Sequence, residues 1–164
     1  MSLTALIIDD EPLARQELQY LLERAGGVEI LAQATNGIEA VELIREHQPD
    51  VIFLDVQMPG LDGFAVLKKL LDRKVPLPQV VFATAFNQYA VRAFEVNAVD
   101  YLLKPFDQKR VIKTIEKAAA RLAAPAESAS EAKLDALLRL MEEQAQGGKS
   151  HSGKVVVRTQ NRLL

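Results

Sequence analysis

The sequence predicts an α/β fold in which a doubly wound, five-stranded parallel sheet is followed by a C-terminal connecting helix. Five short apolar runs alternate with helical patterns up to about residue 122, as expected for right-handed crossovers between parallel strands. Runs such as ALII and VIFL are apolar at every position, which is typical of strands covered on both faces. In sheets of this kind ligands bind beyond the carboxyl ends of the strands.

The expected elements follow one another along residues 1–122. The strands are predicted at residues 3–8, 28–34, 51–54, 79–83 and 99–103. The first helix begins near Pro12, which suits a first helical turn, and ends at the glycine pair that follows Ala25. Apolar spacing predicts further helices around residues 40–44, 64–71 and 111–122. The pattern around residues 89–96 is the weakest, so we expect a short helix there.

After residue 122 the composition changes, and we expect four further segments. Residues 123–130 resemble a linker, and residues 131–146 form an amphipathic connecting helix with one apolar stripe. Residues 147–153 are a flexible linker. Residues 154–164 are β-rich, and from Lys149 onward the chain carries four bases and no acid. We interpret this last segment as the start of a truncated β-rich domain, since it is too short to bury a core.

Composition excludes several classes of site. The chain of 164 residues has no cysteine and two histidines, so thiolate chemistry and a His-based zinc site are not expected. The net charge of −2 gives no general attraction to nucleic acid or membranes. The N-terminal MSLTALIIDDEP lacks the basic leader of a signal peptide, and no apolar run is long enough to span a bilayer. We therefore expect a cytoplasmic protein without membrane contact.

Acidic residues stand at the ends of two predicted strands. Asp9, Asp10 and Glu11 follow the first strand, and Asp55 follows the third. Acids brought together at one sheet edge repel each other, so a cation is expected among them, and oxygen ligands in an open site suit Mg²⁺. The fourth strand ends near Thr84 and the fifth near Lys104.

A carboxylate with a divalent cation, a lysine and a hydroxyl nearby suits phosphoryl transfer. Asp55 is then the expected nucleophile, forming an acyl phosphate. Each residue alone also fits an ordinary role, such as a helix cap or a solvated strand end. Their occurrence at the ends of different strands is what favours the functional interpretation.

These residues carry a resemblance to a known family. LIIDDEP, VIFLDVQMPGLDGF, VVFATAF and VDYLLKPF are similar to the motifs of the receiver (CheY-like) domain of bacterial two-component response regulators. The resemblance implies a flavodoxin-like sheet of strand order 2-1-3-4-5 and a phosphoryl group accepted by Asp55 from a sensor histidine kinase. It also implies that Asp10, Asp55 and the Gln57 carbonyl hold Mg²⁺, with Asp9 assisting. Such a protein is a signalling phosphoacceptor with slow autodephosphorylation and not an enzyme.

The resemblance also implies a conformational switch. Lys104 would pair with phosphoryl oxygens, and the peptide before Pro105 would be cis. Thr84 would hydrogen-bond the phosphoryl group while Tyr101 turns inward, and Phe86 would limit water access and slow hydrolysis. A homodimer would form through the face of the fourth helix, fifth strand and fifth helix.

FNQYAVRAFEVNAVDYLLKPF is similar to receivers of the LytR/AlgR type, and GKVVVRTQNRLL resembles the opening of their LytTR DNA-binding domain. The resemblance implies a transcriptional regulator that binds DNA through a domain truncated here. The amphipathic helix could dock on its own receiver or pair with a second molecule. The alternative to a DNA-binding regulator is a single-domain receiver that acts through protein contacts.

Two other classes fit less well. Phosphohydrolases of the haloacid dehalogenase type use a DxDx[TV] motif, and the acid two residues after Asp55 is replaced by Gln57. A nucleotide-binding domain needs a glycine-rich loop after its first strand, where this chain has acids that would repel phosphate.

Overall fold

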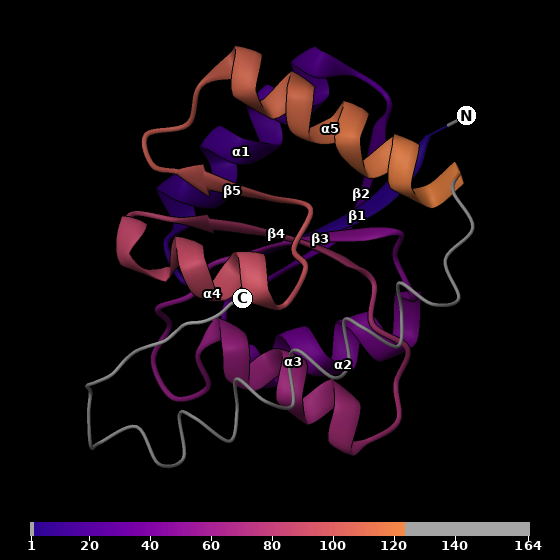
Figure 1. Cartoon of the computed structure of the whole chain (residues 1–164), viewed down its shortest axis with the longest axis vertical. Helices are drawn as coiled ribbons and strands as arrows, with labels where there is room; N and C mark the ends of the chain where they lie inside the picture. Colours follow the sequence, from indigo (N-terminus) through magenta and orange to yellow (C-terminus); the bar gives the residue numbers. More distant parts are fainter. Residues whose placement is uncertain (1, 124–164) are drawn as a thin grey trace, which may run out of the picture.

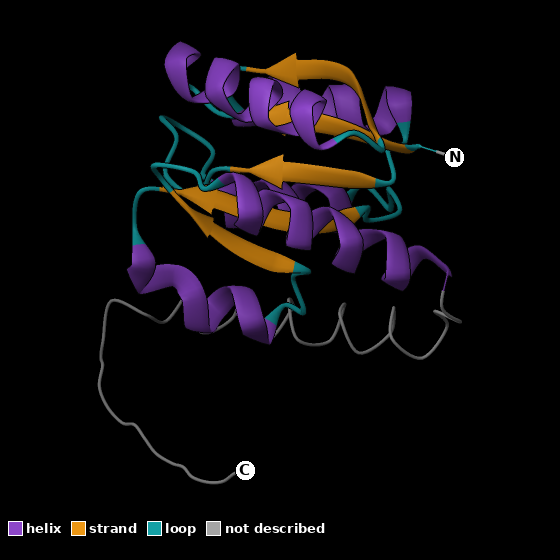
Figure 2. Cartoon of the chain, turned by 90° about the horizontal axis from the view of Figure 1, so that it is seen from above, coloured by secondary structure: helices purple, strands orange, loops and turns teal. Residues whose placement is uncertain are grey.

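Five parallel strands in the order β2-β1-β3-β4-β5 form the centre of the structure, a computed structural model that describes residues 2–123. The strands are β1 (Leu3–Ile8), β2 (Val28–Ala34), β3 (Val51–Leu54), β4 (Gln79–Thr84) and β5 (Asp100–Leu103). Figure 2 shows their arrowheads pointing the same way, and every neighbouring pair is parallel. The predicted fold class and strand order are therefore confirmed.

Helices cover both faces of this sheet. They are α1 (Pro12–Ala25), α2 (Gly37–His47), α3 (Gly63–Asp72), α4 (Ala90–Glu95) and α5 (Gln108–Ala123), with a 3₁₀ turn, η1 (Asn87–Tyr89), before α4. Figure 1 shows α1 and α5 together on one side of the strands, and α2 and α3 on the other. Within residues 2–123, no helix combines the length and the apolar character that a membrane crossing requires.

Two apolar clusters fix the layers. One lies between the sheet and helices α2, α3 and α4, and the other between the sheet and helices α1 and α5. β3 sits at the centre of both, because its four residues are all buried and alternate between the two faces. This is the double coverage that the run VIFL predicted.

The predicted boundaries are close to the observed ones. β4 ends at Thr84 and β5 begins at Asp100, each one residue later than predicted. The predicted short fourth helix is real, with six residues in α4. The two linkers, the connecting helix and the β-rich end, predicted from residue 123 onward, lie almost wholly outside the described residues.

The turn after β3 brings α3 very close to the end of that strand. Asp62 caps α3 by accepting a hydrogen bond of 2.8 Å from the Ala65 amide, and the Gly63 amide donates to the Val56 carbonyl at 2.8 Å. A Cβ atom on Gly63 would lie 2.5 Å from the Asp55 carbonyl oxygen. Glycine at this position therefore lets the helix start against the residue that follows the strand.

Helix α5 is held to the sheet by a buried acid. Asp100, at the start of β5, accepts hydrogen bonds from the Thr114 hydroxyl at 2.6 Å and the Arg110 guanidinium (Nε) at 3.1 Å. Burial alone would raise the pKa of Asp100, but these hydrogen bonds outweigh it and hold the pKa below its usual value. Near the other end of α5, Arg121 donates to the Asn97 carbonyl at 2.9 Å and so ties the last helical turn to the loop after α4.

We predict that Gly63→Ala lowers the free energy of unfolding by about 1 to 3 kcal/mol, because the new methyl group overlaps backbone atoms that cannot move independently. Urea denaturation measures the change. Ile38→Ala, on the exposed first turn of α2, is the control and should alter stability by less than about 0.5 kcal/mol. If Gly63→Ala is as stable as the parent, the close contact expected between the new methyl group and the Asp55 carbonyl oxygen does not destabilise the fold.

Candidate functional site

The carboxyl ends of β1 and β3 place two acids side by side. Ile8 pairs with Leu54 in the parallel ladder, so the next residue of each strand, Asp9 and Asp55, follows at the same sheet edge. The Asp55 amide donates to the Ile8 carbonyl at 3.0 Å, which fixes the backbone at this point. Both acids are buried, with 3 % and 4 % of their surface exposed.

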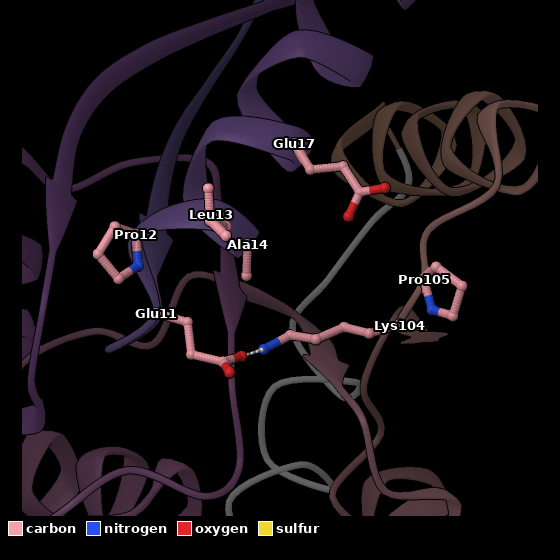
Figure 3. A pocket seen from close by; sticks show the side chains of 7 residues that line it. All are labelled: Glu11, Pro12, Leu13, Ala14, Glu17, Lys104 and Pro105. Atoms are coloured by element: carbon pink, nitrogen blue, oxygen red, sulfur yellow. Dashed lines mark hydrogen bonds and ion pairs between the residues drawn. The ribbon is translucent and has the colours of Figure 1, made fainter.

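Lys104 joins these acids from the end of β5. Its ammonium nitrogen lies 2.8 Å from Asp9 Oδ2, 3.3 Å from Asp55 Oδ2 and 2.6 Å from Glu11 Oε1. Figure 3 shows Lys104 and Glu11 pointing toward each other across the hollow between α1 and the Lys104–Pro105 segment. The Lys104–Pro105 peptide is cis. One cation thus contacts three carboxylates from two separate parts of the chain.

The electrostatics follow from burial and crowding. Burial raises the pKa of Asp55 to about 6, the neighbouring Asp9 adds to the increase, and Lys104 and the Thr84 hydroxyl oppose it. Burial alone would lower the pKa of Lys104, but its hydrogen bonds with Asp9 and Glu11 raise the pKa above the ordinary value. At neutral pH Asp55 is therefore mostly ionised, although it is harder to ionise than an exposed aspartate.

The acids are suited to a divalent cation. Asp9, Glu11 and Asp55 each offer an oxygen, and these oxygens lie within 4.8 Å of one another. Carboxylate and carbonyl oxygens are the ligands that Mg²⁺ prefers. Asp10 is half-buried and stands outside this group, and among the described ion pairs none involves it.

The remaining predicted residues lie around Asp55. Thr84 is fully buried at the end of β4, and its hydroxyl accepts a hydrogen bond of 3.4 Å from the Phe86 amide. Tyr101 is half-buried on β5, and its hydroxyl donates to the Phe86 carbonyl. Burial raises the pKa of Tyr101. Phe86 itself is 39 % exposed, so its ring lies at the surface beside the site.

Gln57 links the loop after β3 to the segment before α4. Its backbone amide donates to Asp55 Oδ1 at 3.3 Å, and its side-chain amide donates to the Tyr89 hydroxyl at 2.7 Å. The family resemblance implied a role only for the Gln57 backbone carbonyl, so the contact of its side chain with Tyr89 was not predicted.

Beside the acids lies a hollow of about 490 Å³. It is lined by Glu11, Pro12, Leu13, Ala14, Glu17, Lys104 and Pro105 (Figure 3). Leu13 is 79 % exposed at its rim. The hollow thus combines an apolar rim with the Glu11–Lys104 pair that leads toward Asp55.

Two residues of this region were not among the predicted site residues. Glu11 belongs to the same acidic run as Asp9, and that run was a usable signal. Tyr89 lies where the helical pattern is weakest, and nothing in the sequence indicates that its hydroxyl reaches a residue 32 positions earlier.

The chain belongs to the response regulator receiver domain family, whose pattern it matches over residues 5–116. It is 49 % identical over 115 residues to the sensory transduction protein LytT of Bacillus anthracis, covering 70 % of this chain and 46 % of that protein. It is 50 % identical over 126 residues to the transcriptional regulatory protein LytR of Staphylococcus aureus, covering 77 % and 51 %. The chain therefore spans about half the length of these curated relatives.

Solved structures agree with this assignment. The response regulatory domain of mrkE from Klebsiella pneumoniae is 34 % identical with a TM-score of 0.65, over 72 % of this chain and 96 % of that one. The REC domain of AraT from Geobacillus stearothermophilus is 32 % identical with a TM-score of 0.65, over 74 % and 96 %. The predicted receiver family and fold are thereby confirmed, and the LytT and LytR relatives confirm the predicted LytR/AlgR type.

We predict that Asp55→Asn raises the free energy of unfolding at pH 7. In the unfolded chain the carboxyl has an ordinary pKa near 3.8, while in the folded protein it is about 6. The folded protein therefore loses stability as the pH rises from 4 to 6, because it must then carry a buried charge. Asparagine removes this cost, so the gain is about 1 to 3 kcal/mol at pH 7 and much smaller at pH 4.

Urea denaturation at both pH values, without divalent cations, measures this effect. Asp72→Asn is the control, because Asp72 is exposed and its pair with Lys68 is a surface contact. A variant that is less stable than the parent at pH 7 would contradict the electrostatic account of the site.

Proposed function

We propose that Asp55 accepts a phosphoryl group from a phosphohistidine of a sensor histidine kinase and that this modification controls the output of a transcriptional regulator. The observation that supports this most directly is the contact of the buried Asp55 carboxylate with Lys104, beside the second acid Asp9. Membership of the receiver family supplies the reaction class.

The transfer uses groups that this chain provides. An Asp55 carboxylate oxygen forms a bond to phosphorus while the phosphorus–nitrogen bond of the donor breaks, and the electron pair stays with the imidazole, which takes up a proton. The ionised carboxylate is available at neutral pH because its pKa of about 6 lies below 7. Lys104 offsets the negative charge of the incoming phosphoryl group through its ammonium.

Magnesium fits the acidic residues of the site. We assign its ligands to Asp10, Asp55 and the Gln57 carbonyl, with Asp9 assisting. Lys104 contacts Asp9, Glu11 and Asp55, whereas Asp10 has no ion pair among the described residues, so the Asp10 carboxylate adds an oxygen that no described cation engages. When bound, Mg²⁺ offsets negative charge on the phosphoryl oxygens.

In this proposal, phosphorylation changes the conformation of the surface formed by α4, β5 and α5, which is then recognised by a second copy of the chain. Thr84 would turn toward the phosphoryl group, and Tyr101 would report the change on β5, with Phe86 at the edge limiting water access. Three apolar side chains are exposed on α4 and β5. Val91 is 69 %, Phe94 84 % and Leu103 45 % exposed. We propose that a second copy of the chain covers this surface after phosphorylation.

We further propose that the output is DNA binding by a C-terminal domain, which is in keeping with a relative that is named a transcriptional regulatory protein and of which the matched residues cover 51 %. In this proposal the protein is a cytoplasmic signalling phosphoacceptor whose own chemistry is limited to Mg²⁺-dependent phosphorylation and slow dephosphorylation. The second candidate is a receiver that acts only through protein contacts. The two differ in whether phosphorylation of the complete protein changes its affinity for promoter DNA.

We predict that incubation with acetyl phosphate and Mg²⁺ adds the mass of one phosphoryl group, and that Asp55→Asn and chelation of Mg²⁺ each abolish the addition. Intact-protein mass spectrometry measures it. Asp72→Asn should be labelled like the parent, because its carboxylate lies away from the site. Labelling that persists in Asp55→Asn would refute the assignment of the acceptor.

We predict that beryllofluoride, a mimic of the phosphoryl group, raises the mass measured by light scattering toward that of a dimer. Phe94→Ala should weaken this dimer by about ten- to 150-fold, since burial of an aromatic side chain contributes about 1.5 to 3 kcal/mol. Leu13→Ala, on α1 and similarly exposed, is the matched control and should leave the dimer unchanged. An equal shift in Phe94→Ala, or none in the parent, would exclude this interface.

A further inference from the structure

The hydrogen bond between Gln57 and Tyr89 positions the side-chain carboxamide of Gln57, two residues after Asp55. The Gln57 side-chain nitrogen donates to the Tyr89 hydroxyl at 2.7 Å, although the backbone amide of the same residue faces Asp55 Oδ1 at 3.3 Å. Within residues 2–123, no hydrogen bond joins the Gln57 carboxamide to Asp55. The side chain therefore turns away from the acceptor while its backbone stays beside it.

Gln57 and Tyr89 both line a separate surface hollow of about 450 Å³. This hollow is lined by Gln57, Met58, Pro59, Gly60, Asp62 and Tyr89. Asp55 is not among the lining residues, so this hollow is distinct from the acceptor carboxylate.

Tyr89 is itself held in place by ring contacts. Its ring centroid lies 6.3 Å from that of Phe64 and 6.4 Å from that of Phe86, the latter in an edge-to-face arrangement. Such contacts restrict the ring through apolar packing. The Tyr89 hydroxyl is thus a positioned acceptor for the exposed Gln57 side chain.

A carboxamide near an acyl phosphate has a specific chemical capacity. Its oxygen accepts and its nitrogen donates, so it can orient a water molecule for attack on phosphorus, as a glutamine does in nucleotide hydrolysis by GTPases. Gln57 is two residues from Asp55 and is exposed, so release of its side chain would allow it to reach that water.

We propose that Tyr89 is a positioning residue that holds the Gln57 carboxamide away from the phosphorylated Asp55 and thereby prolongs the lifetime of the acyl phosphate. This inference rests on the proposed function of Asp55. This role of Tyr89 differs from the proposed steric effect of Phe86, because Tyr89 acts through its hydrogen bond with the Gln57 side chain.

The reaction that Tyr89 slows is hydrolysis. The water oxygen bonds to phosphorus, the phosphorus–oxygen bond to Asp55 breaks, and its electron pair returns to the carboxylate. The products are inorganic phosphate, the free Asp55 carboxylate and one proton released to solvent. No other reactant is needed.

The test compares dephosphorylation of the full chain after labelling with acetyl phosphate and removal of the donor, with Mg²⁺ present. Tyr89→Phe keeps the ring and removes the hydroxyl. We expect its hydrolysis rate to rise by about two- to tenfold, which corresponds to the loss of one ordinary hydrogen bond. Tyr20→Phe is the matched control, because it removes a tyrosine hydroxyl bonded to Arg24 on α1, and its rate should equal that of the parent.

The double variant Tyr89→Phe with Gln57→Ala shows whether the faster hydrolysis requires the Gln57 carboxamide or comes from a general destabilisation of the site. Gln57→Ala retains the backbone carbonyl but removes the carboxamide, so the double variant should return to the parental rate. If the double variant hydrolyses as fast as Tyr89→Phe, or if Tyr89→Phe is unchanged, the role of Tyr89 is refuted while Asp55 stays the acceptor. If acetyl phosphate adds no phosphoryl group to the parent protein, the proposed function is refuted, and so is this inference, which depends on it.

Discussion

The site depends on a single ammonium group that faces three carboxylates. Asp9 and Asp55 follow neighbouring strands and are buried, so the charge of Asp9 makes Asp55 harder to ionise. Lys104, which arrives from β5 on the far side of β4, offsets part of that charge and also engages Glu11. The arrangement leaves a local excess of negative charge at the sheet edge, and this excess is what makes the site suited to a divalent cation.

Much of the fold was predictable because it is encoded in short-range patterns. The run VIFL predicted a strand with both faces covered, and its four residues are all buried. The strand-end rule also predicted that Asp9, Asp55 and Lys104 would meet. The engagement of Glu11 by Lys104 and the contact from Gln57 to Tyr89 were not predictable, since both depend on side-chain directions in loops that no periodicity specifies.

Strand β5 joins the site to the outer surface of the domain. Within a few residues it carries the anchored Asp100, the half-buried Tyr101 and, just beyond its end, Lys104. Because Asp100 is fixed to α5 through Thr114 and Arg110, the movement of Tyr101 that we propose would take place beside this attachment. In the proposed switch, phosphorylation of Asp55 would therefore alter the side-chain surface of β5 without separating α5 from the sheet.

The tie between Arg121 and Asn97 has a practical consequence for building hybrid sensors from this domain. The last turn of α5 is attached to the loop after α4, so it is part of the receiver's own framework rather than the beginning of a spacer. A fusion that joins another output module upstream of Arg121 would remove this attachment and weaken the framework. A junction after Ala123 retains the attachment and leaves the register of the added module free to be varied.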